Sequence, residues 1–151
     1  MPFNINRLND YFWGNRSIIF ITMEIDYNHL MNKAKEVSKN SYSPFSRFAV
    51  GAAVLTPDGQ IYQGCNVENS SFGMTICAER CAIFKAVSEG QREIRAVAIY
   101  SPNADSCYPC GACRQVMYEF QGDEEIEVIT ENMGQLEINK LSYFLPCGFK
   151  I

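Results

Sequence analysis

The spacing of apolar residues changes along the chain, and each change predicts a new element. After Asp26, a residue type that caps helices, apolar side chains recur at helical spacing over residues 27–37. Two extended apolar runs, Phe48–Thr56 and Ile61–Asn66, then flank Pro57-Asp58-Gly59. Proline fixes φ and glycine accepts positive φ, so this tripeptide is typical of a turn. This part of the chain therefore predicts a helix followed by a β-hairpin.

The rest of the pattern predicts two more helices and three more strands. A run that is apolar on most sides precedes Gly90, and a strand, another helix and a second hairpin follow it. These elements are a helix over Ala78–Glu89, a strand over Ala96–Tyr100, a helix over Pro109–Phe120, and strands over Ile126–Thr130 and Gln135–Ile138 joined across Asn132-Met133-Gly134. The order α-β-β-α-β-α-β-β predicts an α/β domain layered around a mixed sheet.

The length of 151 residues and the 47% hydrophobic content suffice for one domain with one core. Residues 1–22 show no clear period, whereas a regular pattern opens at Met23. We therefore expect an N-terminal extension over residues 1–22, either poorly ordered or upstream of a working start at Met23. An oligomer contact through Tyr11, Phe12 and Trp13 is the alternative interpretation. Residues 23–151 are predicted to form a single domain.

Charge and composition exclude several classes of function. A net charge of −4 argues against a general affinity for nucleic acid. No apolar run reaches the roughly 18 residues of a membrane span, so we expect no membrane partner. The seven cysteines are odd in number and no secretory signal is visible, which favours reduced thiols in the cytoplasm. Because His29 is the only histidine, no site can rest on a histidine pair.

Three cysteines stand at predicted helix starts. Cys77 precedes one helix, and Cys110 and Cys113 form a CxxC pair after Pro109, a residue suited to a first helical turn. If the two helix starts face each other, three thiolates converge and the positive helix ends stabilise their charge. Thiolates are the ligands that zinc prefers at tetrahedral sites. We therefore predict a zinc ion at Cys77, Cys110 and Cys113, with a fourth position open to water.

Two charged residues beside these cysteines suit the chemistry of such an ion. Zinc can lower the pKa of bound water to about 7. Glu79 lies two residues after a ligand and can take that water's proton without binding the metal. Three thiolates leave the centre with excess negative charge, which a guanidinium from Arg80 beside the sulfurs would offset. Arg114 could act in the same way from the other helix.

Five segments carry a resemblance to a known family. They are Tyr42–Phe48, Val50–Ala53, Gly64–Asn69, Cys77–Arg80 and Pro109–Gln115. In this order they resemble the zinc-dependent cytidine deaminases, specifically the short homotetrameric type, from about Tyr42 to Phe149. The resemblance implies a three-layer αβα fold with a mixed five-stranded sheet flanked by helices, and one Zn²⁺ per subunit.

The same resemblance implies a reaction. It is the hydrolytic deamination of cytidine and 2′-deoxycytidine to uridine and 2′-deoxyuridine plus ammonia, within pyrimidine salvage. Zinc-bound hydroxide attacks C4 of the base, and Glu79 shuttles protons, as in zinc deaminases generally. The implied partner is therefore a small nucleoside rather than a nucleic acid.

Substrate contacts are also implied by the resemblance. Asn66 and Glu68 match the pair that holds the sugar 3′ hydroxyl. Phe48 matches an aromatic residue that packs on the substrate, and the backbone of Ala78 would hold the edge of the base.

Two further aromatic residues point to an assembly. Phe72 and Phe149 match side chains that family members lend to a neighbouring subunit's site, which implies a homotetramer with shared active sites. Phe72 stands where many relatives have tyrosine, and residues 1–22 have no counterpart in the short family pattern.

Other interpretations compete with a catalytic zinc site. Cys81 lies one helical turn after Cys77, so a closed four-cysteine structural site is the main non-enzymatic alternative. A redox pair of Cys110 and Cys113 is another, although it leaves Cys77-Ala78-Glu79 without a role. Among enzymes, the blasticidin S-type deaminases share the zinc motifs.

The remaining cysteines have no assigned chemistry. We expect them to be small buried hydrophobic residues, and they are Cys65, Cys81, Cys107 and Cys147.

Overall fold

Five strands form one mixed sheet in this protein. The computed structural model describes residues 24–151, so the extension predicted over residues 1–22 lies outside the described residues. The spatial order of the strands is β2-β1-β3-β4-β5. Their bounds are Gly51–Leu55 for β1, Ile61–Cys65 for β2, Ala96–Tyr100 for β3, Glu127–Asn132 for β4 and Gln135–Lys140 for β5. All five predicted strands are therefore present, with ends that differ by up to three residues.

The direction of pairing makes the sheet mixed, as the sequence predicts. Strand β1 pairs antiparallel with both β2 and β3, β3 pairs parallel with β4, and β4 pairs antiparallel with β5. The parallel pair requires a crossover, which is the segment containing α3 (Gly111–Glu119). The start of α3 therefore lies at the end of the sheet to which the carboxyl end of β3 points.

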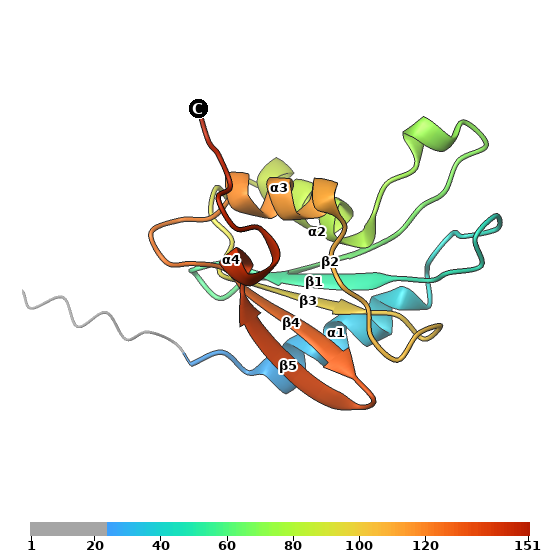
Figure 1. Cartoon of the computed structure of the whole chain (residues 1–151), viewed down its shortest axis with the longest axis horizontal. Coiled ribbons are helices and arrows are strands. Elements are labelled where there is room, and N and C mark those ends of the chain that lie inside the picture. Colours follow the sequence, from blue (N-terminus) through green and yellow to red (C-terminus); the bar gives the residue numbers. More distant parts are fainter. Residues whose placement is uncertain (1–23) are drawn as a thin grey trace, which may run out of the picture.

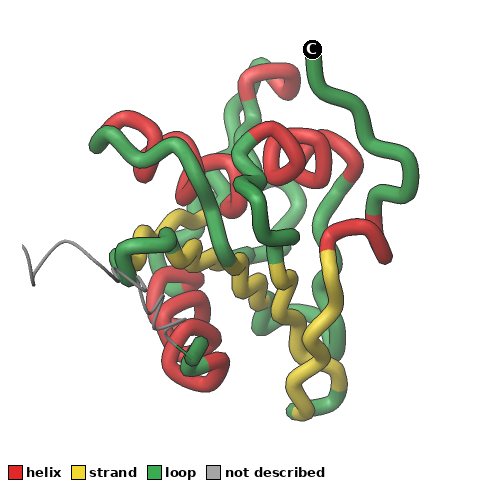
Figure 2. The backbone as a smooth tube through the Cα atoms, turned by 90° about the vertical axis from the view of Figure 1, so that its left-hand side faces the viewer, coloured by secondary structure: helices red, strands yellow, loops and turns green. Residues whose placement is uncertain are grey.

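Helices cover both faces of the sheet, which gives three layers (Figures 1 and 2). Helix α1 (Tyr27–Ser38) lies on one face. Helices α2 (Ala78–Ser88) and α3, with the short α4 (Leu141–Phe144), lie on the other. The core is divided accordingly into two clusters of buried residues, one under α1 and one under α2 and α3. The predicted αβα architecture is confirmed.

The first helix begins where its sequence predicts. A carboxylate oxygen of Asp26 accepts a hydrogen bond from the His29 backbone N–H at 2.9 Å, which caps an otherwise unpaired donor. The apolar stripe of α1 buries Leu30, Met31 and Ala34 almost completely against the small side chains of Ala53 and Ala98 on the sheet.

Two glycines on the hairpin set how closely the helices approach the sheet. A Cβ on Gly51 would stand 2.1 Å from the carbonyl oxygen of Ala34 in α1. A Cβ on Gly64 would stand 2.4 Å from the backbone nitrogen of Ala82 in α2. Because a close approach of two backbones leaves no room for a side chain, these positions hold α1 and α2 against opposite faces of the same hairpin.

The second hairpin turns more tightly than its sequence alone indicates. Asn132 pairs with Gln135, so only Met133 and Gly134 form the loop. Both have positive φ, 48° and 80°, as a type I′ turn requires.

Two short elements were not predicted from the sequence. They are α4 and a single 3₁₀ turn, η2 (Phe72–Met74), each too short to show a period. Within residues 24–151, no helix combines the length and the apolar character that a bilayer crossing requires.

Candidate active site

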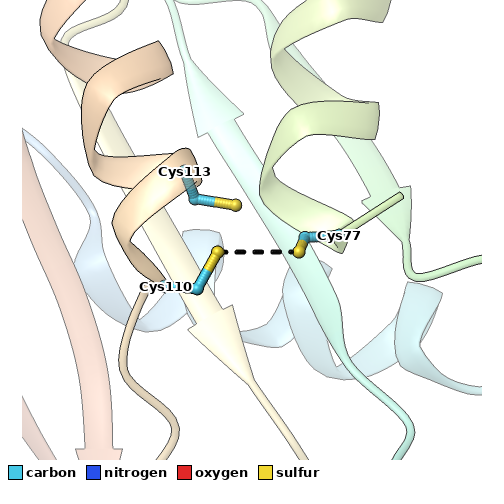
Figure 3. Close-up of side chains that lie close together, drawn as sticks. All are labelled: Cys77, Cys110 and Cys113. Carbon is cyan, nitrogen blue, oxygen red and sulfur yellow. Dashed lines mark hydrogen bonds between the residues drawn. The ribbon is translucent and has the colours of Figure 1, made fainter. Parts of the chain in front are cut away.

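The starts of α2 and α3 bring three thiols together (Figure 3). Cys77 is the residue before α2, and Cys110 is the residue before α3. Cys113 lies in the first turn of α3 and is fully buried. The three sulfur atoms all lie within 4.8 Å of one another, and the Cys77 and Cys110 Sγ atoms are 3.7 Å apart. Among the described residues, this is the single group of at least three potential ligands.

The donor set fits a zinc ion. A tetrahedral zinc with Zn–S bonds of about 2.3 Å holds its sulfurs about 3.8 Å apart, close to the separation of Cys77 and Cys110. Both helix starts also direct unpaired backbone N–H groups toward this region, and such groups favour negative charge. Three ligands leave one tetrahedral position for water or substrate, which is the coordination of catalytic rather than structural zinc sites.

One of the three thiols is strongly acidic. The pKa of Cys77 is lowered to about 5, because the Cys113 thiol donates a hydrogen bond to its thiolate and the Arg80 guanidinium stabilises the charge. The same hydrogen bond raises the pKa of Cys113, and burial adds to that rise. The cluster therefore holds a thiolate near neutral pH, as a metal ligand requires.

Glu79 lies beside the thiols in a nearly water-free position. It is 4% exposed, although it is the only acidic residue in the first turn of α2. Burial raises the pKa of its carboxyl to about 7, and the Cys77 thiolate adds to the rise. A carboxyl group with a pKa near the working pH can both accept and release a proton.

Arg80 reaches the same cluster from the first turn of α2. Its Nη2 atom donates to the Cys77 Sγ atom at 3.3 Å, as predicted for a residue that offsets thiolate charge. Its Nε atom is buried without a hydrogen-bond partner among the described residues. Arg80 is thus held at the thiolates by the hydrogen bond from Nη2 and by its charge.

Arg114 and Cys81 do not join this cluster. The Arg114 guanidinium donates to the backbone oxygens of Pro109 and Phe144, so the prediction that it could neutralise thiolates is wrong. The reason is that its position in α3 directs the side chain toward α4. Cys81 lies outside the group formed by Cys77, Cys110 and Cys113. A closed four-cysteine site is therefore not formed.

Asn66 and Glu68 hold the chain between residues 41 and 50. The Asn66 Nδ2 atom donates to the Phe48 carbonyl oxygen, and its Oδ1 atom accepts from the Val50 N–H, both at 2.8 Å. The Glu68 carboxylate accepts from the backbone N–H groups of Phe45, at 2.7 Å, and Ser46. These bonds fix the backbone on either side of Phe48, whose side chain is 37% exposed.

The other residues assigned by resemblance occupy two kinds of position. Ala78 is fully buried at the start of α2, next to Cys77 and Glu79. Phe72 on η2 and Phe149 near the C-terminus are 71% and 67% exposed. The C-terminal segment and η2 project from different sides of the molecule in Figure 1.

Sequence reasoning missed several contacts around the site. Gln115 donates through Nε2 to the Phe149 carbonyl oxygen at 3.1 Å, which anchors the C-terminal segment on α3. Cys107 is half-buried, and burial raises the pKa of its thiol to about 12. Cys147 is exposed, so the expectation that it is buried is wrong, whereas Cys65 and Cys81 are half-buried. No local pattern marks these contacts, because they depend on how remote segments pack, such as α3 against the C-terminal segment.

Comparison with known proteins identifies the class that this fold and site define. The family described as the cytidine and deoxycytidylate deaminase zinc-binding region matches residues 24–130. The cytidine deaminase of Sporosarcina psychrophila is 43% identical over 125 residues, which cover 83% of this chain and 92% of that protein. The cytidine deaminase of Halalkalibacterium halodurans is 41% identical, with 83% and 95% covered.

A solved structure agrees in fold as well as in sequence. The crystal structure of cytidine deaminase from Burkholderia pseudomallei matches with a TM-score of 0.76 and 41% identity, over 83% of this chain and 100% of that one. The chain therefore belongs to the cytidine and deoxycytidylate deaminase family, whose zinc-binding region includes Cys77, Cys110 and Cys113. The resemblance to the zinc-dependent cytidine deaminase family is confirmed, and zinc is the cofactor.

Proposed function

We propose that this chain catalyses the hydrolytic deamination of cytidine and 2′-deoxycytidine to uridine and 2′-deoxyuridine, with release of ammonia. The observation that carries the proposal is the buried Glu79 carboxyl, with a pKa near 7, beside three converging thiols. Relatives named cytidine deaminase at 41–43% identity over most of the chain support the substrate.

The metal ligands and the acid–base residue have separate tasks. Cys77, Cys110 and Cys113 would hold one zinc ion per chain through their three sulfurs, which lie within 4.8 Å of one another. When bound, zinc supplies an acidified water as the nucleophile for C4 of the base. Glu79 accepts a proton from that water and donates it to N3 of the cytosine ring. It then carries the second proton to the departing amino group, so that water and cytidine become uridine and ammonia.

Arg80 keeps the metal centre electrophilic in this proposal. Three thiolates bring a charge of −3 to a dication, and the excess weakens its pull on water. The hydrogen bond from Arg80 to the Cys77 sulfur withdraws electron density from that ligand. Arg80 therefore acts in this proposal through Cys77, not on the substrate itself.

The nucleoside site is built on the loop that Asn66 and Glu68 hold. Hydrogen bonds from Ser46 and Phe45 lower the pKa of the Glu68 carboxyl, so it is ionised and accepts a hydrogen bond from a sugar hydroxyl well. Asn66 lies at the same end of β2, where its Oδ1 atom already accepts from Val50 and Ser41. Its Nδ2 atom donates one N–H to Phe48 and keeps a second N–H for the sugar. Phe48 packs on the substrate, and the Ala78 backbone holds the base edge at the start of α2.

The proposed assembly is a homotetramer with shared active sites. Phe72 and Phe149 are large, apolar and mostly exposed, which favours their burial against another subunit. The segments that carry them, η2 and the C-terminal segment, project from different sides of one chain in Figure 1, so each would serve a different neighbour. The need of the zinc site for reduced thiols supports a place in the cytoplasm. Pyrimidine salvage follows from a reaction that returns a free nucleoside.

The deciding experiment follows near-ultraviolet absorbance while purified protein is mixed with cytidine. We expect the parent to convert cytidine to uridine. Glu79→Gln should retain about one zinc per chain and lose at least about a hundredfold in rate. Glu89→Gln, an exposed change at the other end of α2, is the matched control and should behave like the parent.

Two outcomes would contradict the proposal. Full activity in Glu79→Gln would remove the carboxyl from the reaction. If the parent protein holds its zinc but does not convert cytidine, the substrate must be another compound with an amino-substituted ring. Blasticidin S is then the first compound to test. Cys81→Ser should keep its zinc in either case, because Cys81 lies outside the thiol group.

A further inference from the structure

Arg114 makes contacts that neither the zinc chemistry nor the substrate site explains. It lies next to Cys113 in the first turn of α3, and its side chain points back toward the segment before the helix. Its Nε atom donates to the Pro109 carbonyl oxygen at 2.8 Å, and its Nη1 atom donates to the Phe144 carbonyl oxygen at 2.9 Å. One guanidinium therefore connects the chain before Cys110 to the end of α4.

These contacts act directly on the peptide bond that leads into a metal ligand. The carbonyl held by Arg114 belongs to the Pro109–Cys110 peptide, and the backbone N–H of Arg114 donates to the Cys110 carbonyl at 3.0 Å. Both carbonyls that flank the Cys110 Cα atom are thus bonded to Arg114. Proline has no N–H group, so Pro109 cannot be held through a backbone donor of its own. Orientation of this segment therefore depends on its carbonyl oxygens.

The position of Cys110 needs such support. Cys110 is exposed and precedes the first residue of α3, whereas Cys113 is buried within the helix. A metal site tolerates deviations of only about 0.2 Å in its bond lengths. The one carbonyl of α4 that accepts from Arg114 is that of Phe144, its last residue, and the Phe144 ring lies 5.8 Å from the guanidinium carbon.

We propose that Arg114 is a positioning residue that holds Cys110 in place for zinc and couples the zinc site to α4. The inference rests on zinc binding by the three thiols and does not depend on which nucleoside is the substrate. Coupling is reciprocal, so zinc must stabilise the docking of α4 as much as docked α4 strengthens zinc binding. The C-terminal segment that carries Phe149 continues from α4.

The charge of Arg114 and its geometry can be separated by substitution. Arg114→Lys keeps a positive charge but cannot span the two carbonyls with one ammonium group. Arg114→Leu removes the charge and both hydrogen bonds. Arg92 provides a matched control, because its Nη1 atom donates to the carbonyls of Val87 and Gln91, both at 2.8 Å, near the end of α2 that lies away from the thiols.

Zinc affinity, measured by competition with a chromogenic chelator, is the first test. We expect both Arg114 variants to bind zinc about tenfold or more weakly than the parent, and Arg92→Lys and Arg92→Leu to match it. Cobalt substituted for zinc should show altered absorption bands in the Arg114 variants, because its spectrum reports the arrangement of the thiolates. If Arg114→Leu does not fold, Arg114→Lys decides the question.

Hydrogen exchange tests the coupling in the parent itself. Removal of zinc should speed exchange of the Leu145 N–H, which donates to Leu141 across α4, and restoring zinc should reverse it. In Arg114→Lys this response to zinc should be lost. Zinc affinity in Arg114→Lys equal to that of the parent would overturn the positioning role. Equal exchange with and without zinc would overturn the coupling, whatever the outcome for cytidine.

Discussion

Among single residues, Glu79 shows how burial alters a carboxyl group. It is placed by the start of α2, which faces α3 rather than solvent, and it has no cationic partner close enough to restore its usual pKa. The same burial that prepares it to exchange a proton near pH 7 makes its ionised form costly in the folded protein. Function and stability are therefore opposed at this position.

This opposition predicts a pH-dependent stability. The folded-state pKa of Glu79, about 7, lies above the ordinary value of 4.5, so the folded protein binds more protons between these values. The contribution of Glu79 to the free energy of unfolding is therefore greatest below about pH 4.5 and is lost as the pH rises toward 7. With zinc removed, Glu79→Gln should gain on the order of 3 kcal/mol relative to the parent between pH 4.5 and 8.

Urea denaturation of the chelator-treated parent and of the Glu79→Gln variant, at a series of pH values, measures this difference. Subtracting the two curves cancels the titration of the groups that do not interact with Glu79. Parallel curves across the range would mean that Glu79 titrates as it does in the unfolded chain.

At the scale of elements, the packing of α2 on β2 decides where Cys77 lies. The helix approaches the strand so closely that Gly64 lies against the backbone of α2. The sequence shows a glycine at position 64, but it does not show which helix packs against it. On the opposite face, Gly51 meets α1 in the same way. The sheet separates α1 from α2 and α3, whose starts carry the thiols (Figure 1).

Substitution of each glycine by alanine should affect stability similarly and zinc affinity differently. Gly64→Ala should cost about 1–3 kcal/mol of stability and also weaken zinc binding, because α2 must shift and it carries Cys77 at its start. Gly51→Ala should cost a similar amount, because α1 must shift, but should leave the affinity for zinc near that of the parent. Denaturation and zinc competition assays on both variants test the difference.

Gly73→Ala is the control, since a Cβ there would have open space around it. It should match the parent in stability and in zinc affinity. Equal loss of zinc affinity in Gly51→Ala and Gly64→Ala would show that general destabilisation, not displacement of α2, controls the site.

At the scale of the whole molecule, large aromatic side chains remain exposed to solvent in the single chain. Phe72 and Phe149 expose most of their area, and they belong to segments that leave the compact body in different directions. Phe45 packs against Phe72 with ring centroids 5.6 Å apart, so the loop held by Glu68 and the η2 turn meet at this surface. Such a surface is expected to be covered by other copies of the chain.

Shared sites predict complementation between two damaged subunits. A Phe72→Ala subunit retains Cys77 and Glu79 in its own site but cannot contribute Phe72 to a neighbour's site. A Glu79→Gln subunit can contribute Phe72 to a neighbour but lacks the proton-transferring carboxyl in its own site. Co-expressed with different tags and purified through both, the mixed oligomer should be several-fold more active than Phe72→Ala alone, because some intact sites receive Phe72 from a Glu79→Gln neighbour.

Phe84→Ala is the matched control, because Phe84 is an exposed aromatic residue on α2 outside the proposed shared site. It should be close to the parent in activity, alone or mixed. Mixed oligomers no more active than the average of their homogeneous parents would assign Phe72 to its own subunit's site or to none.

The sequence by itself determined the local elements and the kinds of ligand at the site. Helical and alternating apolar periods depend on neighbours within a few residues, so the order of helices and strands could be predicted from them. Cys77, Cys110 and Cys113, with Glu79 and Arg80, were predicted because metal and acid–base chemistry demand particular residue types at short spacings. Short elements such as η2 and α4 could not be predicted, since they are stabilised by contacts rather than by a period.

Only the tertiary structure decided how these parts meet. Cys77 and Cys110 are 33 positions apart, and their sulfurs converge because the β3-to-β4 crossover places α3 beside α2. In the folded chain, Arg114 donates to the carbonyls of Pro109 and Phe144 rather than to the thiols. Sequence spacing alone does not show which of these groups the side chain contacts. Side-chain direction, burial and the distances between remote segments arise from packing, and packing is a property of the whole chain.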